Sequence, residues 1–224
     1  MASRKDRTLV RGILAGAEEP SDIVIKEGRV ESIKPSGRAK SDFGSKTCII
    51  APTLFDIQVN GANGIDLQSK SITPDDVVSL NDFLASQGVS HWIPTVITGS
   101  TKQMLHGCKV IAESMQDPRV KRAIPGIHLE GPCISPEDGP RGAHAKRHVR
   151  PPSLEEFEEF MKAARGSIAY ITVAPEVEGV LPFIREMVQR KVRVALGHHN
   201  AAPEQIERAV RAGAVLSTHL GNGM

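Results

Sequence analysis

Hydrophobic and polar positions alternate along this chain in a pattern that changes near residue 52. Before that point the apolar runs are short and β-like, and the first two flank a turn at 26–28. These runs lie at 23–25, 29–33 and 47–50. After residue 52, apolar runs of strand length alternate with segments that carry apolar residues at helical spacing. The pattern predicts a small β-rich domain over 1–51 and parallel strand-plus-helix units over 52–224.

Six strands are predicted in the second region. They span 53–60, 89–98, 124–130, 168–174, 192–197 and 214–219. Helix starts lie between them: Thr73 is an N-cap followed by a proline and two acidic residues, and Ser153 opens a capping box. The predicted helices span 73–84, 102–115, 153–161, 181–190 and 202–210.

The strand starts lie 22 to 44 residues apart, which is typical of a (β/α) barrel or of a doubly wound sheet. No glycine-rich phosphate fingerprint follows the first strand, which argues against a dinucleotide fold. Polar residues recur at the carboxyl ends of the strands, where barrel enzymes collect their active sites. We therefore predict an α/β fold of the (β/α)8 TIM-barrel type. A complete barrel takes about 250 residues, so six of its eight βα units are expected here.

Composition excludes several classes of protein. Hydrophobic residues make up 40% of the chain and charged residues 24%, as in globular proteins, and the net charge of +2 gives no basic surplus for nucleic acid. No apolar stretch is long enough to span a membrane and the start is polar, so a cytoplasmic protein is expected. Cys48, Cys108 and Cys133 are too far apart for a metal knuckle and are expected to be small buried side chains.

Candidate chemistry lies at three predicted strand ends. Glu130 ends an apolar strand, where a buried carboxylate must take up a proton or pair with a cation such as a metal ion. His198 and His219 end the last two strands and can point toward the same barrel mouth. One carboxylate and two imidazoles suit Zn²⁺ with a fourth position open to water, although Fe, Co and Mn accept the same ligands. Such a site lowers the pKa of bound water, which predicts hydrolysis.

The positions of two further histidines relative to Glu130 and His198 indicate which way their side chains point. His128 lies two residues before Glu130 on the same predicted strand, so the two side chains point to the same face. His128 therefore either faces the interior behind the metal site or is a hydrogen-bonded core histidine. His199 has the opposite parity from His198 and is expected to be structural or peripheral.

Five segments together carry a family resemblance. They are PTLFDIQVNGANGID (52–66), GIHLEGP (126–132), RGAH (141–144), ALGHHNA (195–201) and STHLGNGM (217–224). In this order they resemble the N-acetylglucosamine-6-phosphate deacetylase family of the amidohydrolase superfamily. The resemblance implies a metal-dependent (β/α)8 barrel with a small β-sandwich, a homodimer, and removal of acetate from N-acetylglucosamine 6-phosphate to give glucosamine 6-phosphate.

The resemblance also implies roles for particular residues. Its metal ligands correspond to Glu130, His198 and His219. Gln58 and Asn60 stand where many amidohydrolases carry a histidine pair for a second metal; because amides are weaker ligands, one ion is expected. His144 corresponds to a histidine that helps polarise the substrate carbonyl. Asn222 and Gly223 match a segment that holds the sugar phosphate.

Departures from the family pattern keep alternatives open. Two glycines at 221 and 223 replace the larger side chains of the usual HLFNAM segment, so substrate preference is expected to differ. The family's acid/base aspartate, and the Arg and His that complete its phosphate site, would follow Met224 along the chain. The alternatives are an amidohydrolase for another N-acyl substrate, and a catalytically silent fragment that binds metal or a partner.

Overall fold

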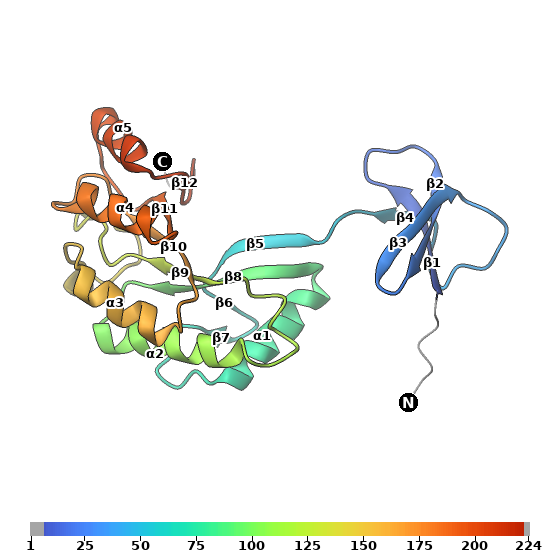
Figure 1. Ribbon diagram of the computed structural model, residues 1–224, viewed down its shortest axis with the longest axis horizontal. Helices are drawn as coiled ribbons and strands as arrows, with labels where there is room; N and C mark the ends of the chain where they lie inside the picture. The colour runs from blue at the N-terminus through green and yellow to red at the C-terminus, as the bar shows by residue number, and fades with distance from the viewer. Residues whose placement is uncertain (1–6, 222–224) are drawn as a thin grey trace. The chain divides into compact units, whose positions relative to one another are not determined.

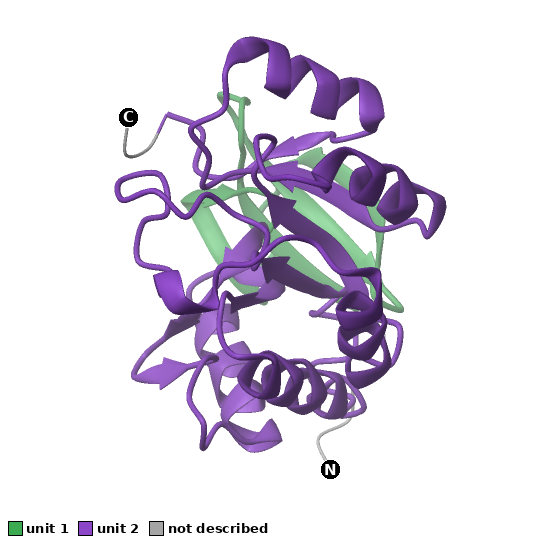
Figure 2. Ribbon diagram, turned by 90° about the vertical axis from the view of Figure 1, so that its left-hand side faces the viewer, with its two compact units in different colours: residues 1–53 green, residues 54–224 purple. Residues whose placement is uncertain are grey.

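The computed structural model describes residues 7–221, which fall into two compact units divided between residues 53 and 54 (Figure 2). The first unit is one four-stranded sheet in the order β3-β2-β1-β4, with β1 antiparallel to β2 and parallel to β4. Its strands are β1 (Arg7–Leu14), β2 (Pro20–Lys26), β3 (Arg29–Pro35) and β4 (Phe43–Ile50). The predicted turn at 26–28 joins β2 to β3, and both Glu27 and Gly28 have positive φ, as a tight hairpin turn requires.

Strand β1 was not predicted, because Arg11 and Gly12 interrupt its apolar pattern. Arg11 is buried and pairs with Asp22 on β2, with Nε 2.6 Å from Oδ1. A Cβ atom at Gly12 would lie 2.6 Å from the carbonyl oxygen of Cys48, so glycine permits the close approach of β1 and β4. Both residues that hide the strand in the sequence therefore serve its pairing in the sheet.

The second unit is a curled parallel sheet of six strands in the order β12-β11-β10-β9-β8-β5 (Figure 1). Each strand lies beside the next one along the chain apart from the small hairpin between β5 and β8, as successive βα units of a barrel do. Its strands are β5 (Leu54–Val59), β8 (Val89–Ile97), β9 (Ile127–Glu130), β10 (Ile168–Val173), β11 (Arg193–Leu196) and β12 (Leu216–Ser217). The prediction of a partial TIM barrel is confirmed.

Five α-helices of the described chain cover the outer face of this sheet (Figures 1 and 2). They are α1 (Pro74–Ser86), α2 (Thr101–Ser114), α3 (Leu154–Ala163), α4 (Val180–Gln189) and α5 (Pro203–Ala212). The predicted N-caps are confirmed: the Thr73 and Ser153 side chains accept hydrogen bonds from the backbone amides of Asp76 and Glu156. The full capping box predicted at Ser153 is not formed, because the Glu156 carboxylate bonds Arg150 and Thr101 instead. Between sheet and helices lies the core, which includes the fully buried Trp92.

Some element bounds differ from those expected. β9 begins at Ile127 rather than at 124, β12 is only two residues long, and a short hairpin of β6 (Gly61–Ala62) and β7 (Ile65–Asp66) was not predicted. A short 3₁₀ helix, η1 (Lys146–His148), lies in the loop after β9. Strand bounds depend on pairing with neighbours, which an apolar run does not specify.

The cysteines are split between core and surface. Cys108 and Cys133 are buried as expected, but the expectation was wrong for Cys48, which is exposed on β4. That strand is exposed over almost its whole length, so an apolar residue on it does not enter a core.

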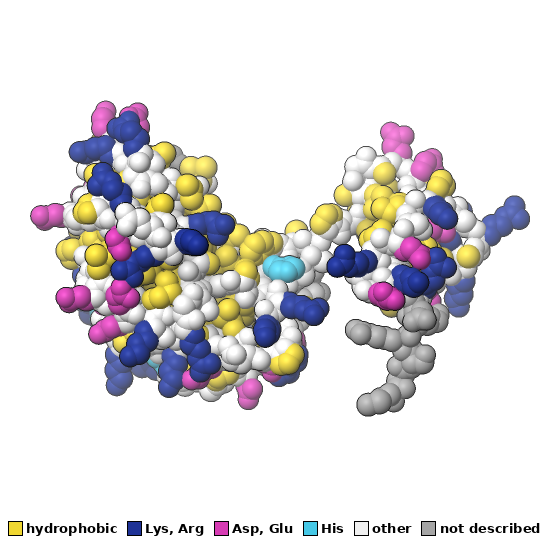
Figure 3. Space-filling model, viewed as in Figure 1, with side chains coloured by type: hydrophobic (Ala, Val, Ile, Leu, Met, Phe, Trp, Pro, Cys, Tyr) yellow, Lys and Arg dark blue, Asp and Glu magenta, His cyan; other side chains and the backbone are white. Residues whose placement is uncertain are grey.

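The surface carries both signs of charge. Basic and acidic side chains both occur on the face of the second unit drawn in Figure 3, together with scattered apolar side chains. Within residues 7–221, no helix combines the length and the hydropathy needed to cross a membrane.

Candidate metal centre

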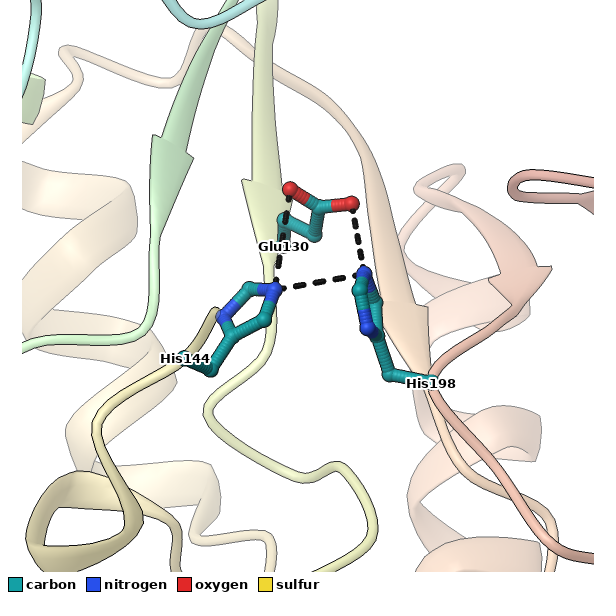
Figure 4. Close-up of side chains that lie close together, drawn as sticks. All are labelled: Glu130, His144 and His198. Atoms are coloured by element: carbon teal, nitrogen blue, oxygen red, sulfur yellow. Dashed lines mark hydrogen bonds and ion pairs between the residues drawn. The ribbon is translucent and has the colours of Figure 1, made fainter. Parts of the chain in front are cut away.

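Five polar side chains gather at the carboxyl ends of the barrel strands. Glu130 is the last residue of β9, while His198 and His219 each follow the end of a strand, β11 and β12, by two residues. Gln58 lies on β5, and His144 reaches the same point from the loop after β9. Figure 4 shows three of these side chains, Glu130, His144 and His198, pointing toward one another. We call the five residues the Glu130 cluster.

The distances within the Glu130 cluster are those of direct contact. The Oε1 atom of Glu130 lies 2.8 Å from Nε2 of Gln58, 3.0 Å from Nε2 of His198 and 3.1 Å from Nε2 of His219. His144 adds its Nε2 atom at 3.2 Å from Nε2 of His198 and 3.9 Å from Oε2 of Glu130 (Figure 4). Three imidazoles and an amide therefore surround one carboxylate.

The chain turns sharply at both strand-end histidines. His198 and His219 have φ values of +52° and +56°, in the left-handed region that is sparsely populated by residues other than glycine. The preceding Gly197 lies directly against Thr218. A Cβ atom at this glycine would be only 2.6 Å from the Cβ atom of Thr218, so the close approach requires glycine. The two turns thus lie side by side and direct both imidazoles at Glu130.

Hydrogen bonding of His198 tests whether a cation fits the cluster. Its Nδ1 atom lies 3.2 Å from the carbonyl oxygen of Pro140, which only accepts, so Nδ1 carries a proton. In a neutral ring Nε2 is then a bare lone pair that faces the Glu130 carboxylate at 3.0 Å. Two acceptors at this distance repel unless a proton or a metal ion lies between them. Ligand atoms around one tetrahedral Zn²⁺ lie about 3.4 Å apart, close to the distances observed.

Burial and charge set the ionisation of Glu130. The residue is 1% exposed, and burial by itself raises the pKa of its carboxyl. Against burial act a hydrogen bond from His198 in the form in which a proton lies between its Nε2 atom and the carboxylate, and the positive charges that His128, His198 and His144 carry when protonated at low pH; together they lower the pKa to about 2. Glu130 is therefore an ionised carboxylate at neutral pH, in the form that binds metal ions.

His144 is held in its neutral form. Burial, and then the charge of His198, lower the pKa of His144 to about 4 despite the opposing effect of Glu130. Its Nδ1 atom is buried without a hydrogen-bond partner, whereas Nε2 points into the cluster. A neutral ring with Nδ1 unprotonated carries its proton on Nε2, where it can be donated to a group that enters the cluster.

The structure places the other candidate residues as follows. Glu130, His144 and His198 form a group whose ligand atoms lie close enough to share one metal ion, and His219 contacts the same carboxylate from a position 42% exposed. Asn60 is exposed and is not part of this hydrogen-bonded cluster of described residues, although Gln58 is. Two predicted sugar-phosphate residues, Asn222 and Gly223, lie outside the described residues.

His128 is a buried core residue directly behind the Glu130 cluster. It is 0% exposed, hydrogen-bonded to Thr95 and Thr172, and stacked on Tyr170 with ring centroids 3.8 Å apart. Burial lowers the pKa of His128 to about 3, against the raising effect of Glu130. Tyr170 and Thr172 were not singled out in the sequence, because they read as ordinary interior positions of a strand.

Known proteins of similar sequence are deacetylases of N-acetylated sugar phosphates. No protein-family model matches the chain. The chain is 34% identical to an N-acetylglucosamine-6-phosphate deacetylase of Danio rerio, over 91% of this chain and 52% of that protein. It is 30% identical to an N-acetylgalactosamine-6-phosphate deacetylase of Escherichia coli O157:H7, over 89% of this chain and 52% of that protein. The chain thus spans about half the length of the curated relatives it matches.

A solved structure shares the whole described fold. It is a mutant N-acetyl-D-glucosamine-6-phosphate deacetylase from Mycobacterium smegmatis in complex with N-acetyl-D-glucosamine-6-phosphate. The two chains superpose with a TM-score of 0.86 at 26% identity, over 98% of this chain and 57% of the other. Sequence identity over most of this chain, together with this common architecture, shows that the chain resembles about half of an N-acetylglucosamine-6-phosphate deacetylase.

Proposed function

We propose that the Glu130 cluster binds one divalent metal ion, with Glu130, His198 and His219 as its ligands. The observation that carries this proposal is the convergence of acceptor atoms, above all Nε2 of His198, on one buried carboxylate oxygen. A carboxylate with two imidazoles is a donor set typical of Zn²⁺. Gln58 offers only an amide and Asn60 is exposed, which favours a single ion.

We further propose that the protein hydrolyses the acetamido group of N-acetylglucosamine 6-phosphate to glucosamine 6-phosphate and acetate. The family resemblance of the chain and the names of its relatives support this reaction. A Zn²⁺ ion bound in the cluster would act as a Lewis acid on the amide carbonyl and lower the pKa of water to about 7. N-acetylgalactosamine 6-phosphate is a second candidate substrate, because the Escherichia coli O157:H7 relative is named for it.

The residues of the chain divide the remaining work. Glu130 stays ionised and buried, so it holds a cation firmly and does not act as a free base. His144 directs its Nε2 atom into the cluster and donates a hydrogen bond to the carbonyl oxygen, on which negative charge develops during attack. Since Oε1 of Glu130 is already contacted by three side chains, we assign protonation of the departing amine to an acid outside the Glu130 cluster.

Metal binding by paired histidine variants tests the site. His198→Ala removes a proposed ligand, whereas His199→Ala removes the adjacent, half-buried imidazole, whose Nδ1 atom accepts a hydrogen bond from the backbone amide of Ala201. After loading with Zn²⁺ and removal of unbound ion, metal analysis should find about one ion per chain in the wild type and in His199→Ala, and none in His198→Ala. A wild-type chain without stoichiometric metal would contradict the proposal, as would equal loading of both variants.

Acetate release by the protein tests the substrate. N-acetylglucosamine 6-phosphate, N-acetylgalactosamine 6-phosphate and unphosphorylated N-acetylglucosamine are compared at equal concentration. Preference for the first supports the proposed reaction, and preference for the second supports the alternative. Equal turnover of the unphosphorylated sugar would refute a phosphate-specific enzyme. From the family resemblance we also propose that the protein is a cytoplasmic homodimer. A measurement of the protein's mass in solution tests whether it is a dimer.

A further inference from the structure

A buried hydrogen-bonded network lies directly beneath the Glu130 cluster. It consists of five residues on strands β8, β9 and β10 and at the end of β12, which we call the inner network: Thr95, His128, Tyr170, Thr172 and Thr218. Thr95, His128 and Thr172 are 0% exposed and Tyr170 is 5% exposed. Polar groups buried this deeply cost stability unless they are satisfied, so the pairing within the network is informative.

One continuous line of hydrogen bonds crosses the sheet. Oγ1 of Thr218 lies 2.8 Å from Oγ1 of Thr172, which lies 2.7 Å from Nε2 of His128. On the other side of the ring, Nδ1 lies 3.1 Å from Oγ1 of Thr95. With a neutral His128, one consistent arrangement has Thr218 donating to Thr172, Thr172 to Nε2, Nδ1 to Thr95, and the Thr95 hydroxyl to the carbonyl oxygen of Ile93 at 3.4 Å. Each donor then has an acceptor, so the line is fully satisfied.

Tyr170 makes a second connection, across the interior of the curled sheet. Its hydroxyl donates to the carbonyl oxygen of Ile57 at 2.6 Å, although β10 and β5 are separated by β9 and β8 in the sheet. β5 is an edge strand within the described sheet, its register on β8 is irregular, and most of its residues are exposed. The tyrosine is therefore a direct tie between this edge strand and the centre of the sheet.

The inner network reaches positions close to three members of the Glu130 cluster. Ile57 immediately precedes Gln58, and Thr218 immediately precedes His219. His128 lies two residues before Glu130 on the same face of β9 and stacks on the Tyr170 ring. The network thus touches the backbone or side chain beside three of the five cluster residues, each from a different strand.

We propose that Tyr170 and Thr172 are positioning residues of the metal site: their hydroxyls fix where Gln58 and His219 stand relative to Glu130. This inference rests on the proposed metal-binding function. Hydrogen-bond partners that orient metal ligands contribute about 10- to 100-fold to metal affinity. Thr172→Val, which keeps the shape but loses both hydrogen bonds, should therefore weaken Zn²⁺ binding about 10-fold, and Tyr170→Phe should act in the same direction.

The test measures affinity and ligand geometry separately from stability. Zn²⁺ affinity is measured by competition with a chromophoric chelator, and the visible spectrum of the Co²⁺-loaded chain reports ligand geometry. Thr172→Ser restores the hydroxyl and should restore both readouts. Ser114→Ala is the matched control, because it removes a buried hydroxyl that bonds a carbonyl at 2.7 Å in α2, away from the site. It should lower stability to urea and leave affinity and spectrum unchanged.

The outcomes separate this inference from the proposed function. Wild-type affinity and an unchanged Co²⁺ spectrum in both Thr172→Val and Tyr170→Phe would overturn the positioning role, as would an equal loss of affinity in Ser114→Ala. A wild-type chain that takes up no Zn²⁺ would overturn the proposed function instead. In that case the histidine ring ¹⁵N signals of the metal-free chain decide: a shift of the His219 signals in Thr172→Val supports positioning, and unchanged signals refute it.

Discussion

Replacement of Glu130 by glutamine is the most direct perturbation of the cluster, because it removes the charge and keeps the shape. The pKa of this carboxyl falls from its ordinary 4.5 to about 2 in the folded chain, so the folded state favours the ionised form. At about 1.4 kcal/mol per pKa unit, this preference contributes about 3 kcal/mol to the metal-free chain at neutral pH. Glu130→Gln should therefore lower the free energy of unfolding by about 3 kcal/mol at pH 7.

The pH dependence gives the sign of the same effect. A carboxyl with a lowered pKa stabilises the fold above its unfolded pKa and loses that contribution as pH falls through the folded pKa. The difference between wild type and Glu130→Gln should thus be constant above about pH 5 and shrink between pH 4.5 and about 2. Urea unfolding in the presence of a chelator, followed by circular dichroism, measures it.

Added Zn²⁺ provides the second half of the experiment. At a free concentration 100 times the dissociation constant, a ligand that binds only the folded state stabilises it by about 2.7 kcal/mol. The wild type should gain this amount and Glu130→Gln almost none. Glu156→Gln is the control, since Glu156 is a partly buried carboxylate that bonds Arg150 and Thr101 outside the cluster. Equal stabilisation of wild type and Glu130→Gln by Zn²⁺ would refute the reasoning.

Three further predictions follow from neighbouring features. Gly197→Ala places a Cβ atom 2.6 Å from that of Thr218, so Zn²⁺ affinity measured by chelator competition should fall about 10-fold. Gly99→Ala is the control, because its Cβ atom would face only a flexible glutamine side chain and should not change the affinity. Equal affinities of the two variants would contradict the packing argument. His128 has a pKa lowered from 6.5 to about 3, so the unfolded chain binds more protons between these values and stability should fall as pH drops below 6.5. His128→Gln should flatten urea midpoints between pH 6.5 and 4.5, and an unaltered slope would count against a neutral buried ring. Phe157→Ala, at a core position 2% exposed, should cost about 3–5 kcal/mol in urea unfolding with Zn²⁺ affinity retained in the folded fraction, whereas a loss below 1 kcal/mol would mean that the site is not packed as described.

Local signals predicted the helices well, because their causes are local. Thr73 and Ser153 cap the helices that follow them through hydrogen bonds three residues away, so the capping residues mark each start in the sequence itself. Strands were predicted less completely. β1 is hidden by Arg11 and Gly12, whose reasons for being there, the Asp22 pair and the approach of β4, involve residues distant in sequence.

The sequence pattern by itself indicated that three of the five side chains of the Glu130 cluster meet. Glu130 ends a parallel strand, and His198 and His219 each lie two residues past the end of one. Because the carboxyl ends of neighbouring parallel strands share one edge of the sheet, the convergence of these side chains follows from their order along the chain. How they meet was decided only by tertiary structure. The left-handed turns at the two histidines, the Pro140 carbonyl that orients one ring, and the Tyr170 tie to Ile57 all join segments far apart in sequence. Such contacts are set by packing and by the need to satisfy buried polar groups, neither of which leaves a periodic trace in the chain.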